Sequence, residues 1–248
     1  MTLFTHVVTL EPVPRRWFDQ CVAMLHETVD SLRPEHDGLV TEDGRTVSAV
    51  RLVEGRHAHA GARYALPEGS GNAVITAWNP RTATAGQVEI DDDETYIAVD
   101  GTLRPNRLDA AGVMVVKQYK RLSSLSWSGA AELDRWWAGG RGAAPITASA
   151  THMFVIARAT ITQRPATDGR WAVKVALKLR GRSVFWPFVA LAMVFARDRV
   201  QKSINETLAT YAAKWNAEMP PLLRKSSDEL RAMLLEAITD ESSSAEAG

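Results

Sequence analysis

The feature that most constrains the fold is a stretch near the C-terminus that changes from the period of a strand to that of a helix. From Trp171 to Arg180, apolar residues alternate with lysine, arginine or alanine, which predicts a strand with one buried and one solvated face. From Pro187 to Met219, apolar residues recur every three or four positions, which predicts one long helix that ends at Pro220. A helix of this length with a continuous apolar stripe requires a broad sheet to cover it.

The strands of that sheet must come from the residues before it. Phe4–Leu10 is predicted to be a strand, and apolar spacing predicts a helix from about Arg15 to Leu32. Turn sequences separate further candidate strands, which are Thr46–Val53, Asn72–Trp78, Thr84–Ile90, Thr95–Val99, Gly112–Tyr119 and His152–Thr162. Ser128–Ala138 is predicted to be a short helix. This order of elements indicates an α+β protein.

Two further segments follow the long helix. Ser226 and Glu229 form a capping-box pattern ahead of several apolar residues, which predicts a short amphipathic helix within 222–238. Residues 239–248 are small, polar and acidic, and we expect them to be disordered. The chain is therefore expected to form one domain over residues 1–221, followed by the short helix and the tail.

The last strand and the start of the long helix resemble a known protein family. The resemblance is carried by Leu177-Lys-Leu-Arg-Gly-Arg-Ser-Val-Phe-Trp-Pro-Phe188 and Ala196-Arg-Asp-Arg-Val200. These residues are similar to those of the START/polyketide-cyclase-like superfamily (SRPBCC, Bet v 1-like proteins), and the likeness covers about residues 151–219. It implies the helix-grip fold, an α+β fold in which a curved antiparallel sheet grips a long C-terminal helix. Because typical members are shorter than this chain, it also implies an insertion within about residues 33–142.

The resemblance further implies a hydrophobic cavity between the sheet and the C-terminal helix. Large apolar side chains at the helix entry are the candidate ligand-binding residues: Phe185, Trp186, Phe188 and Met193. The alternative is that these side chains fill the core and leave no cavity. His152 and Arg158, expected on the strand face opposite Met153 and Val155, could anchor a polar group of the ligand. Their alternative is a solvated outer face.

Residues suited to a metal or to nucleophilic catalysis form no strong pattern. His57 and His59 would share one face of a strand, which suits zinc or copper if a third ligand is added, but an exposed pair is the simpler interpretation. Asp91-Asp-Asp-Glu94 lacks the ligand spacing and turn glycine of a calcium loop, which favours a solvated hairpin tip. Cys21 lies on an apolar helical stripe, as a structural thiol would. Because no linear catalytic motif is present either, we expect no metal and no cofactor.

Composition narrows the class of partner. Lys plus Arg and Asp plus Glu both number 29 in 248 residues, so no overall charge favours nucleic acid, and we expect none as a partner. The longest apolar run, residues 184–196, is shorter than the roughly 20 residues that span a bilayer, so no transmembrane segment is expected. The same run could instead contact a membrane interface. A single cysteine and the lack of a visible signal peptide suit a cytoplasmic protein.

Two functional hypotheses follow from these observations. The first is binding or transfer of a hydrophobic small molecule, lipid or polyketide-like, in the cavity; its enzymatic variant is a cyclase or aromatase. The second is a non-catalytic interaction or assembly subunit, in which the expected insertion, the Trp136-Trp137 segment and the C-terminal amphipathic helix contact a protein partner or a second copy of the chain. A cluster of Arg, His or Glu in a cavity would favour an enzyme, and a large exposed apolar patch would favour assembly.

Overall fold

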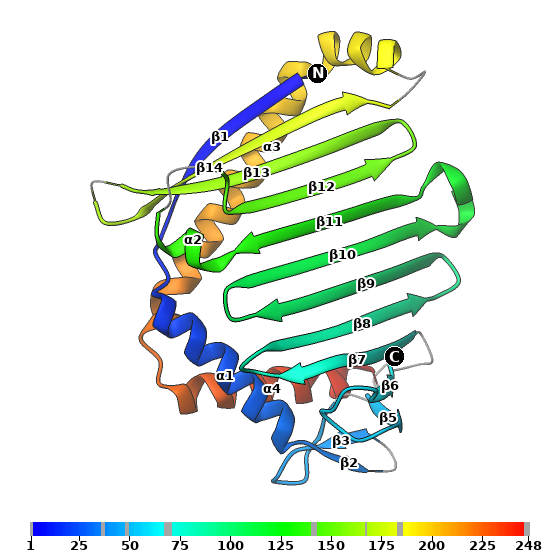
Figure 1. Cartoon of the computed structure of the whole chain (residues 1–248), viewed down its shortest axis with the longest axis vertical. Helices are drawn as coiled ribbons and strands as arrows, with labels where there is room; N and C mark the ends of the chain where they lie inside the picture. The colour runs from blue at the N-terminus through cyan, green and yellow to red at the C-terminus, as the bar shows by residue number, and fades with distance from the viewer. Residues whose placement is uncertain are drawn as a thin grey trace. The chain divides into compact units, whose positions relative to one another are not determined.

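The computed structural model describes residues 2–35, 38–47, 50–66, 71–139, 143–166, 168–182 and 186–245 (Figure 1). Within these ranges it does not describe the side chains of residues 120–122, 165, 186–195 and 240–245. The chain divides into two compact units. The first unit comprises residues 1–13 and 106–223, and the second comprises residues 14–105 and 224–248. Both units therefore combine segments that are distant in sequence.

The first unit is built on six antiparallel strands. They are β1 (Thr2–Leu10), β10 (Arg107–Val116), β11 (Leu125–Glu132), β12 (Ile146–His152), β13 (Val155–Pro165) and β14 (Trp171–Gly181). Their order is β1-β14-β13-β12-β11-β10, which makes β1 an edge strand. The connections include the 3₁₀ helix η2 (Lys117–Leu122) and the short helix α2 (Leu133–Trp137).

Alternation along these strands separates a buried face from a solvated one. Phe4 of β1 is 1% exposed and pairs with Leu177 of β14, and the buried Val173 lies on the same face. Lys174 and Lys178 point to the other face and are exposed. The strand predicted from Trp171 onward is therefore confirmed, together with its two faces.

The long helix α3 (Trp186–Leu223) packs on β1 and β14, and Figure 1 shows it behind them. The side-chain amide of Asn216 donates to the carbonyl of Thr9 and accepts from the backbone N–H of Glu11, both at 2.8 Å. Trp215 Nε1 donates to the carbonyl of Glu11 at 2.9 Å. These bonds satisfy backbone groups at the end of β1 and at Glu11, which follows it.

The C-terminal end of α3 differs from the prediction. Pro220 and Pro221 lie inside the helix, which ends at Leu223 rather than at Pro220. Each proline lacks the N–H that would donate to the carbonyl four residues earlier, so the helical hydrogen bonds are interrupted there and the helix ends two residues after Pro221. The predicted helix is thus confirmed and its predicted end is wrong.

The second unit contains α1 (Arg15–Ser31), α4 (Ser227–Ala245) and eight strands. The strands are β2 (Arg33–Glu35), β3 (Gly38–Val40), β4 (Thr46–Val47), β5 (Arg51–Glu54), β6 (Arg63–Ala65), β7 (Gly71–Asn79), β8 (Ala83–Asp91) and β9 (Thr95–Arg104). Strands β9-β8-β7-β6-β5 are neighbours in that order, and β2-β3-β4 form a separate small sheet. The predicted capping box before α4 is confirmed, because Ser226 N–H donates to a Glu229 carboxylate oxygen at 2.7 Å.

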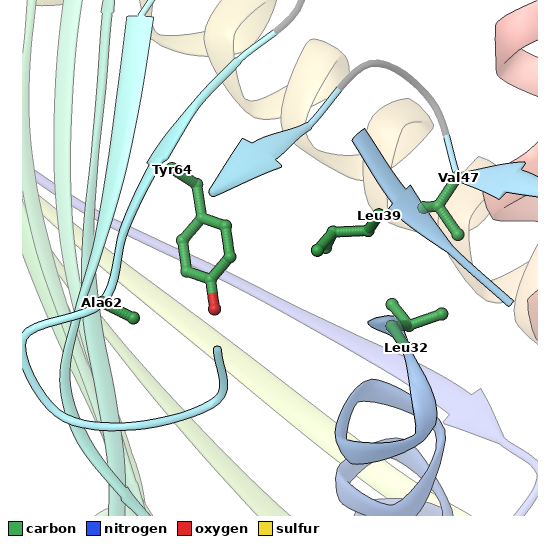
Figure 2. Close-up of a cluster of buried hydrophobic side chains, with 5 residues drawn as sticks. All are labelled: Leu32, Leu39, Val47, Ala62 and Tyr64. Carbon is green, nitrogen blue, oxygen red and sulfur yellow. The ribbon is translucent and has the colours of Figure 1, made fainter. Parts of the chain in front are cut away.

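A compact apolar cluster holds the small sheet in the second unit. Figure 2 shows its members, which are Leu32, Leu39, Val47, Ala62 and Tyr64. They come from the residue that follows α1, from β3 and β4, and from β6 with the residue before it. Burying these side chains supplies the hydrophobic stabilisation that strands of two to four residues could not obtain from pairing alone.

A chain of hydrogen bonds lies beside this cluster. His57 Nε2 lies 2.9 Å from the carbonyl of Val29, which can only accept, so this nitrogen carries the proton. His57 Nδ1 then accepts from the Tyr64 hydroxyl at 2.9 Å, and the hydroxyl oxygen accepts from the backbone N–H of Ala58 at 3.0 Å. Ala58 has a φ of 52°, a left-handed conformation that a non-glycine residue adopts at an energetic cost. The Tyr64 hydroxyl therefore holds a strained loop in place.

The fold class predicted from the sequence is wrong. The structure is not a curved sheet gripping one long helix: the described strands form an antiparallel sheet of eleven and a second sheet of three, and two helices follow at the C-terminus. Segments expected to form an insertion, such as Gly71–Asn79 and Ala83–Asp91, are strands of the large sheet itself. Period-two patterning identifies a strand and its buried face, but it does not encode which strand lies beside it.

Two local predictions are also corrected. His152–Thr162 is not one strand, because β12 ends at His152 and β13 begins at Val155. Ser128 lies in β11, so the predicted helix is reduced to the five residues of α2. In neither place does a glycine or proline stand at the boundary between the two elements.

Candidate ligand-binding site

A pocket of about 270 Å³ lies in the second unit between α1 and the ends of β8 and β9. We call it the α1 pocket. Most of its wall is apolar and is formed by Phe18, Val22, Ala23, Pro80, Leu103 and Pro105. Its volume is close to the lower end of the range typical of small-molecule sites, roughly 300–1,000 Å³. The pocket therefore suits a small ligand with a substantial apolar part.

Helical spacing explains how α1 supplies one side of the pocket. Arg15, Asp19, Val22 and His26 follow one another at steps of three or four residues. Residues at this spacing lie on the same face of a helix, one turn above the other. One face of α1 thus presents two charged groups, an apolar side chain and an imidazole to the same space.

His26 and Thr84 form the polar floor of the α1 pocket. His26 is 5% exposed, and its Nδ1 lies 2.8 Å from the carbonyl of Val22, so Nδ1 carries the proton in the neutral ring. Its Nε2 is then an acceptor, and the Thr84 hydroxyl donates to it at 2.5 Å. The His26 ring also packs against Trp78, with ring centroids 5.0 Å apart. A hydroxyl bonded to an oriented imidazole is the relation found in nucleophilic catalysis, here with a backbone carbonyl as the orienting group.

Charged groups at the mouth of the α1 pocket carry a net positive charge. The Arg15 guanidinium donates through Nε to Asp19 Oδ1 at 2.8 Å and through Nη2 to the carbonyl of Pro105. These bonds hold Arg15 across the space between α1 and the end of β9. Arg104 adds a second cation to the lining. The lining therefore contains two guanidinium groups and one carboxylate, a formal charge of about +1.

The helix-entry residues predicted to bind a ligand lie elsewhere. Phe185 is outside the described residues. Trp186, Phe188 and Met193 belong to the first turns of α3, where side chains are not described. None of the four lines the α1 pocket. The cavity predicted between the last strand and the C-terminal helix consequently stays a prediction.

The two polar residues predicted beside them lie on opposite faces of their sheet. Arg158 pairs with Lys178 and Ser149 on the solvated face and is exposed. His152 ends β12 on the face that carries Ala150, and its ring packs against Phe154 with centroids 5.3 Å apart. The two were predicted to share a face because they were assigned to one strand. The chain reversal at residues 153–154 separates them.

Arg158 borders a shallow polar hollow of about 420 Å³ on the solvated face of the first unit. At the far side of the hollow, Arg107 donates through Nε to Asp109 at 2.8 Å and through Nη1 to Glu132. These two carboxylates raise the pKa of the Arg107 guanidinium above its usual value. Two carboxylates against one guanidinium leave a formal charge of about −1 at this end, and the hollow offers less apolar surface than the α1 pocket.

The residues considered for metal binding have structural roles. Both ring nitrogens of His57 are used, by Val29 and Tyr64, while His59 Nδ1 lies 2.9 Å from the carbonyl of His57. Asp92 Oδ1 accepts the backbone N–H groups of two following residues and so fixes the turn before β9. Within the described ranges, no group of three or more His, Cys, Asp or Glu side chains could hold a metal ion.

Cys21 and the helices complete the survey of functional features. Cys21 is partly buried, and burial raises the pKa of its thiol, which lowers the fraction of reactive thiolate. No helix among the described residues is long and apolar enough to cross a membrane. The sequence analysis did not predict the α1 pocket. A signal was present, because His26 is a polar residue among the buried residues of an amphipathic helix.

No protein-family model, curated protein or solved structure matches the chain. The resemblance to the START/polyketide-cyclase-like superfamily is therefore untested by these comparisons and stays a prediction.

Proposed function

We propose that this protein binds a small amphipathic molecule, with an apolar body and an anionic group, in the α1 pocket. The observation that carries the proposal is the combination of an apolar wall with an excess of positive charge at the mouth of one pocket. The sequence analysis predicted a hydrophobic small molecule as the ligand. The positive charge of the pocket lining restricts this class to molecules that also carry an anionic group. Its place differs from the expected one, since the α1 pocket is formed by α1, β8 and β9.

The apolar wall favours a hydrocarbon body. Phe18 and Val22 face the pocket from α1, and Leu103 faces it from β9. Transfer of apolar surface from water to such a wall contributes roughly 25 cal/mol per Å². The polar floor would add little to this, because Thr84 and His26 already satisfy each other.

Three features of the pocket mouth favour an anion. Arg15 and Arg104 outnumber Asp19, which gives an attractive field for a carboxylate or phosphate. Arginine donors also match the geometry of these groups. In addition, α1 begins at Arg15 with neither a capping side chain nor an acidic residue in its first turn, so the positive end of the helix dipole is uncompensated there.

Calorimetric titration with octanoate and 1-octanol tests both halves of the proposal. The two compounds share a hydrocarbon chain and differ in the anionic group. We expect octanoate to bind the full-length protein at least about tenfold more tightly than octanol, which corresponds to ~1.4 kcal/mol. Equal affinities would contradict the role of the cations, and no heat from either compound would contradict the binding function.

Substitutions locate the binding to the pocket. Arg104→Gln should weaken octanoate about tenfold and leave octanol unchanged, because it removes one positive charge from the lining. Ala23→Phe should abolish binding of both compounds by filling the pocket. Leu25→Phe, on an exposed position of the same helix that does not line the pocket, is the matched control and should bind as the wild type does. An Ala23→Phe protein that still bound octanoate would place the site elsewhere.

A further inference from the structure

The solvated face of the first unit carries a concentration of positive charge that the neutral composition conceals. Strands β1, β12, β13 and β14 contain no Asp or Glu. They contain five lysine and arginine residues, all exposed, which are Arg158, Arg164, Lys174, Lys178 and Arg180. The register of β13 with β14 places all five on one face of the sheet, opposite the buried face of Phe4 and Val173. We call this surface the cationic face.

Two apolar side chains interrupt the cationic face. Leu3 and Val7 of β1 are 46% and 56% exposed. Leu3 pairs with Lys178 and Val7 pairs with Lys174, so each apolar side chain lies beside a lysine of the neighbouring strand β14. A solvated strand face is normally polar, because apolar surface in contact with water is unfavourable. The arrangement therefore indicates a partner that binds basic side chains and also accepts apolar ones.

The structure narrows the kind of partner. Side chains of Gln201 and Asn216 bond to the carbonyls of Thr5 and Thr9 on β1, which hinders pairing of a second strand there. Single-stranded nucleic acid is bound through aromatic side chains that stack on bases, and the outward residues of these four strands include no aromatic. An anionic lipid bilayer has phosphate groups for the basic residues and an interface that accepts isolated aliphatic side chains.

We propose that the cationic face docks this protein on anionic lipid membranes. Arg158, Lys174 and Lys178 contact lipid phosphates, while Leu3 and Val7 enter the interface between head groups and acyl chains. The binding is peripheral and reversible, because two short side chains bury little apolar surface. It involves none of the residues of the α1 pocket, so it stands independently of the proposed ligand-binding function.

Vesicle co-sedimentation tests the proposal with the full-length protein. Vesicles of phosphatidylcholine alone are compared with vesicles that also contain phosphatidylglycerol. Binding is expected to the anionic vesicles alone and is expected to fall as salt is raised. The double variant K174E/K178E should reduce partitioning at least roughly twenty-five-fold, since each basic residue near an anionic surface contributes about fivefold. The double variant L3S/V7S should reduce it about tenfold.

A matched control separates the face from net charge. K202E/K214E changes the net charge by the same amount on exposed positions of α3, and it should bind anionic vesicles as the wild type does. Circular dichroism confirms that each variant is folded. Equal loss in both charge-reversal variants would overturn the proposal, as would absence of binding to anionic vesicles. Normal binding by L3S/V7S, with loss in K174E/K178E, would also overturn it and would favour a general polyanion such as nucleic acid.

Discussion

Replacement of Phe4 by alanine is expected to lower the free energy of unfolding by about 3–5 kcal/mol. Phe4 is 1% exposed and belongs to the largest fully buried side chains of the described protein. It lies on β1, the edge strand whose other anchors are its pairing with β14 and the side chains of α3. Truncation removes the apolar contacts of the ring and leaves a cavity that a paired strand cannot close.

The adjacent residue supplies the control for this prediction. Leu3→Ala removes an apolar side chain one position earlier on the same strand, but Leu3 is 46% exposed on the opposite face. Its effect is expected to stay within about 0.5 kcal/mol, as is usual for surface substitutions. Urea denaturation followed by tryptophan fluorescence measures both variants. Equal losses from Leu3→Ala and Phe4→Ala would contradict the assignment of the two faces.

Replacement of Tyr64 by phenylalanine is expected to cost about 1–3 kcal/mol. The ring volume is nearly kept, but the hydroxyl that donates to His57 Nδ1 and accepts from Ala58 N–H is lost. Ala58 is buried and has a left-handed backbone, so its N–H finds no replacement partner without rearrangement of the loop. Tyr211→Phe makes the same chemical change at a side chain that is 68% exposed and should change stability little.

This prediction has a defined pH dependence. Burial raises the pKa of the Tyr64 hydroxyl above its ordinary value of 10.0. A folded-state pKa above the unfolded one gives stability that is present below about pH 10 and is lost as pH rises through the folded-state pKa. The wild type should therefore lose stability over this alkaline range more steeply than Tyr64→Phe does. Parallel losses in the two proteins would contradict the burial of the Tyr64 hydroxyl.

Much of the secondary structure could be predicted from local patterns. The alternation from Trp171 and the helical stripe up to Met219 both correspond to real elements, because burial of one face imposes its period on the sequence. The start of α4 was predictable because Ser226 and Glu229 satisfy backbone groups at a helix start through local contacts. These signals involve residues close in sequence.

The fold class required information that local patterns do not contain. Strands such as Gly71–Asn79 were recognised, but nothing in their own residues states that they belong to the same sheet as the C-terminal strands. The reversal after His152 was missed for a related reason, since Met153 and Phe154 are not turn-forming residues. That single missed turn placed His152 and Arg158 on one face, whereas they lie on two.

The candidate site depended on the same missing information. Thr84 and Leu103 meet His26 and Val22 through the arrangement of α1 with β8 and β9, more than fifty residues apart in sequence. A threonine within a strand has no distinctive pattern, so its hydrogen bond to an imidazole could not be anticipated. The amphipathic character of α1 was nevertheless visible, and it correctly indicated a helix with one face turned inward.

The measurement that tests the central claim most directly is a methyl-resolved NMR titration of the full-length protein with octanoate. We expect saturable shifts of the methyl signals of Val22 and Leu103, which line the α1 pocket. The methyl signals of Leu39 and Val47, in the separate apolar cluster of the same unit, should stay unchanged and serve as the internal reference. Shifts confined to residues outside the pocket, or no shifts at any concentration, would contradict the account.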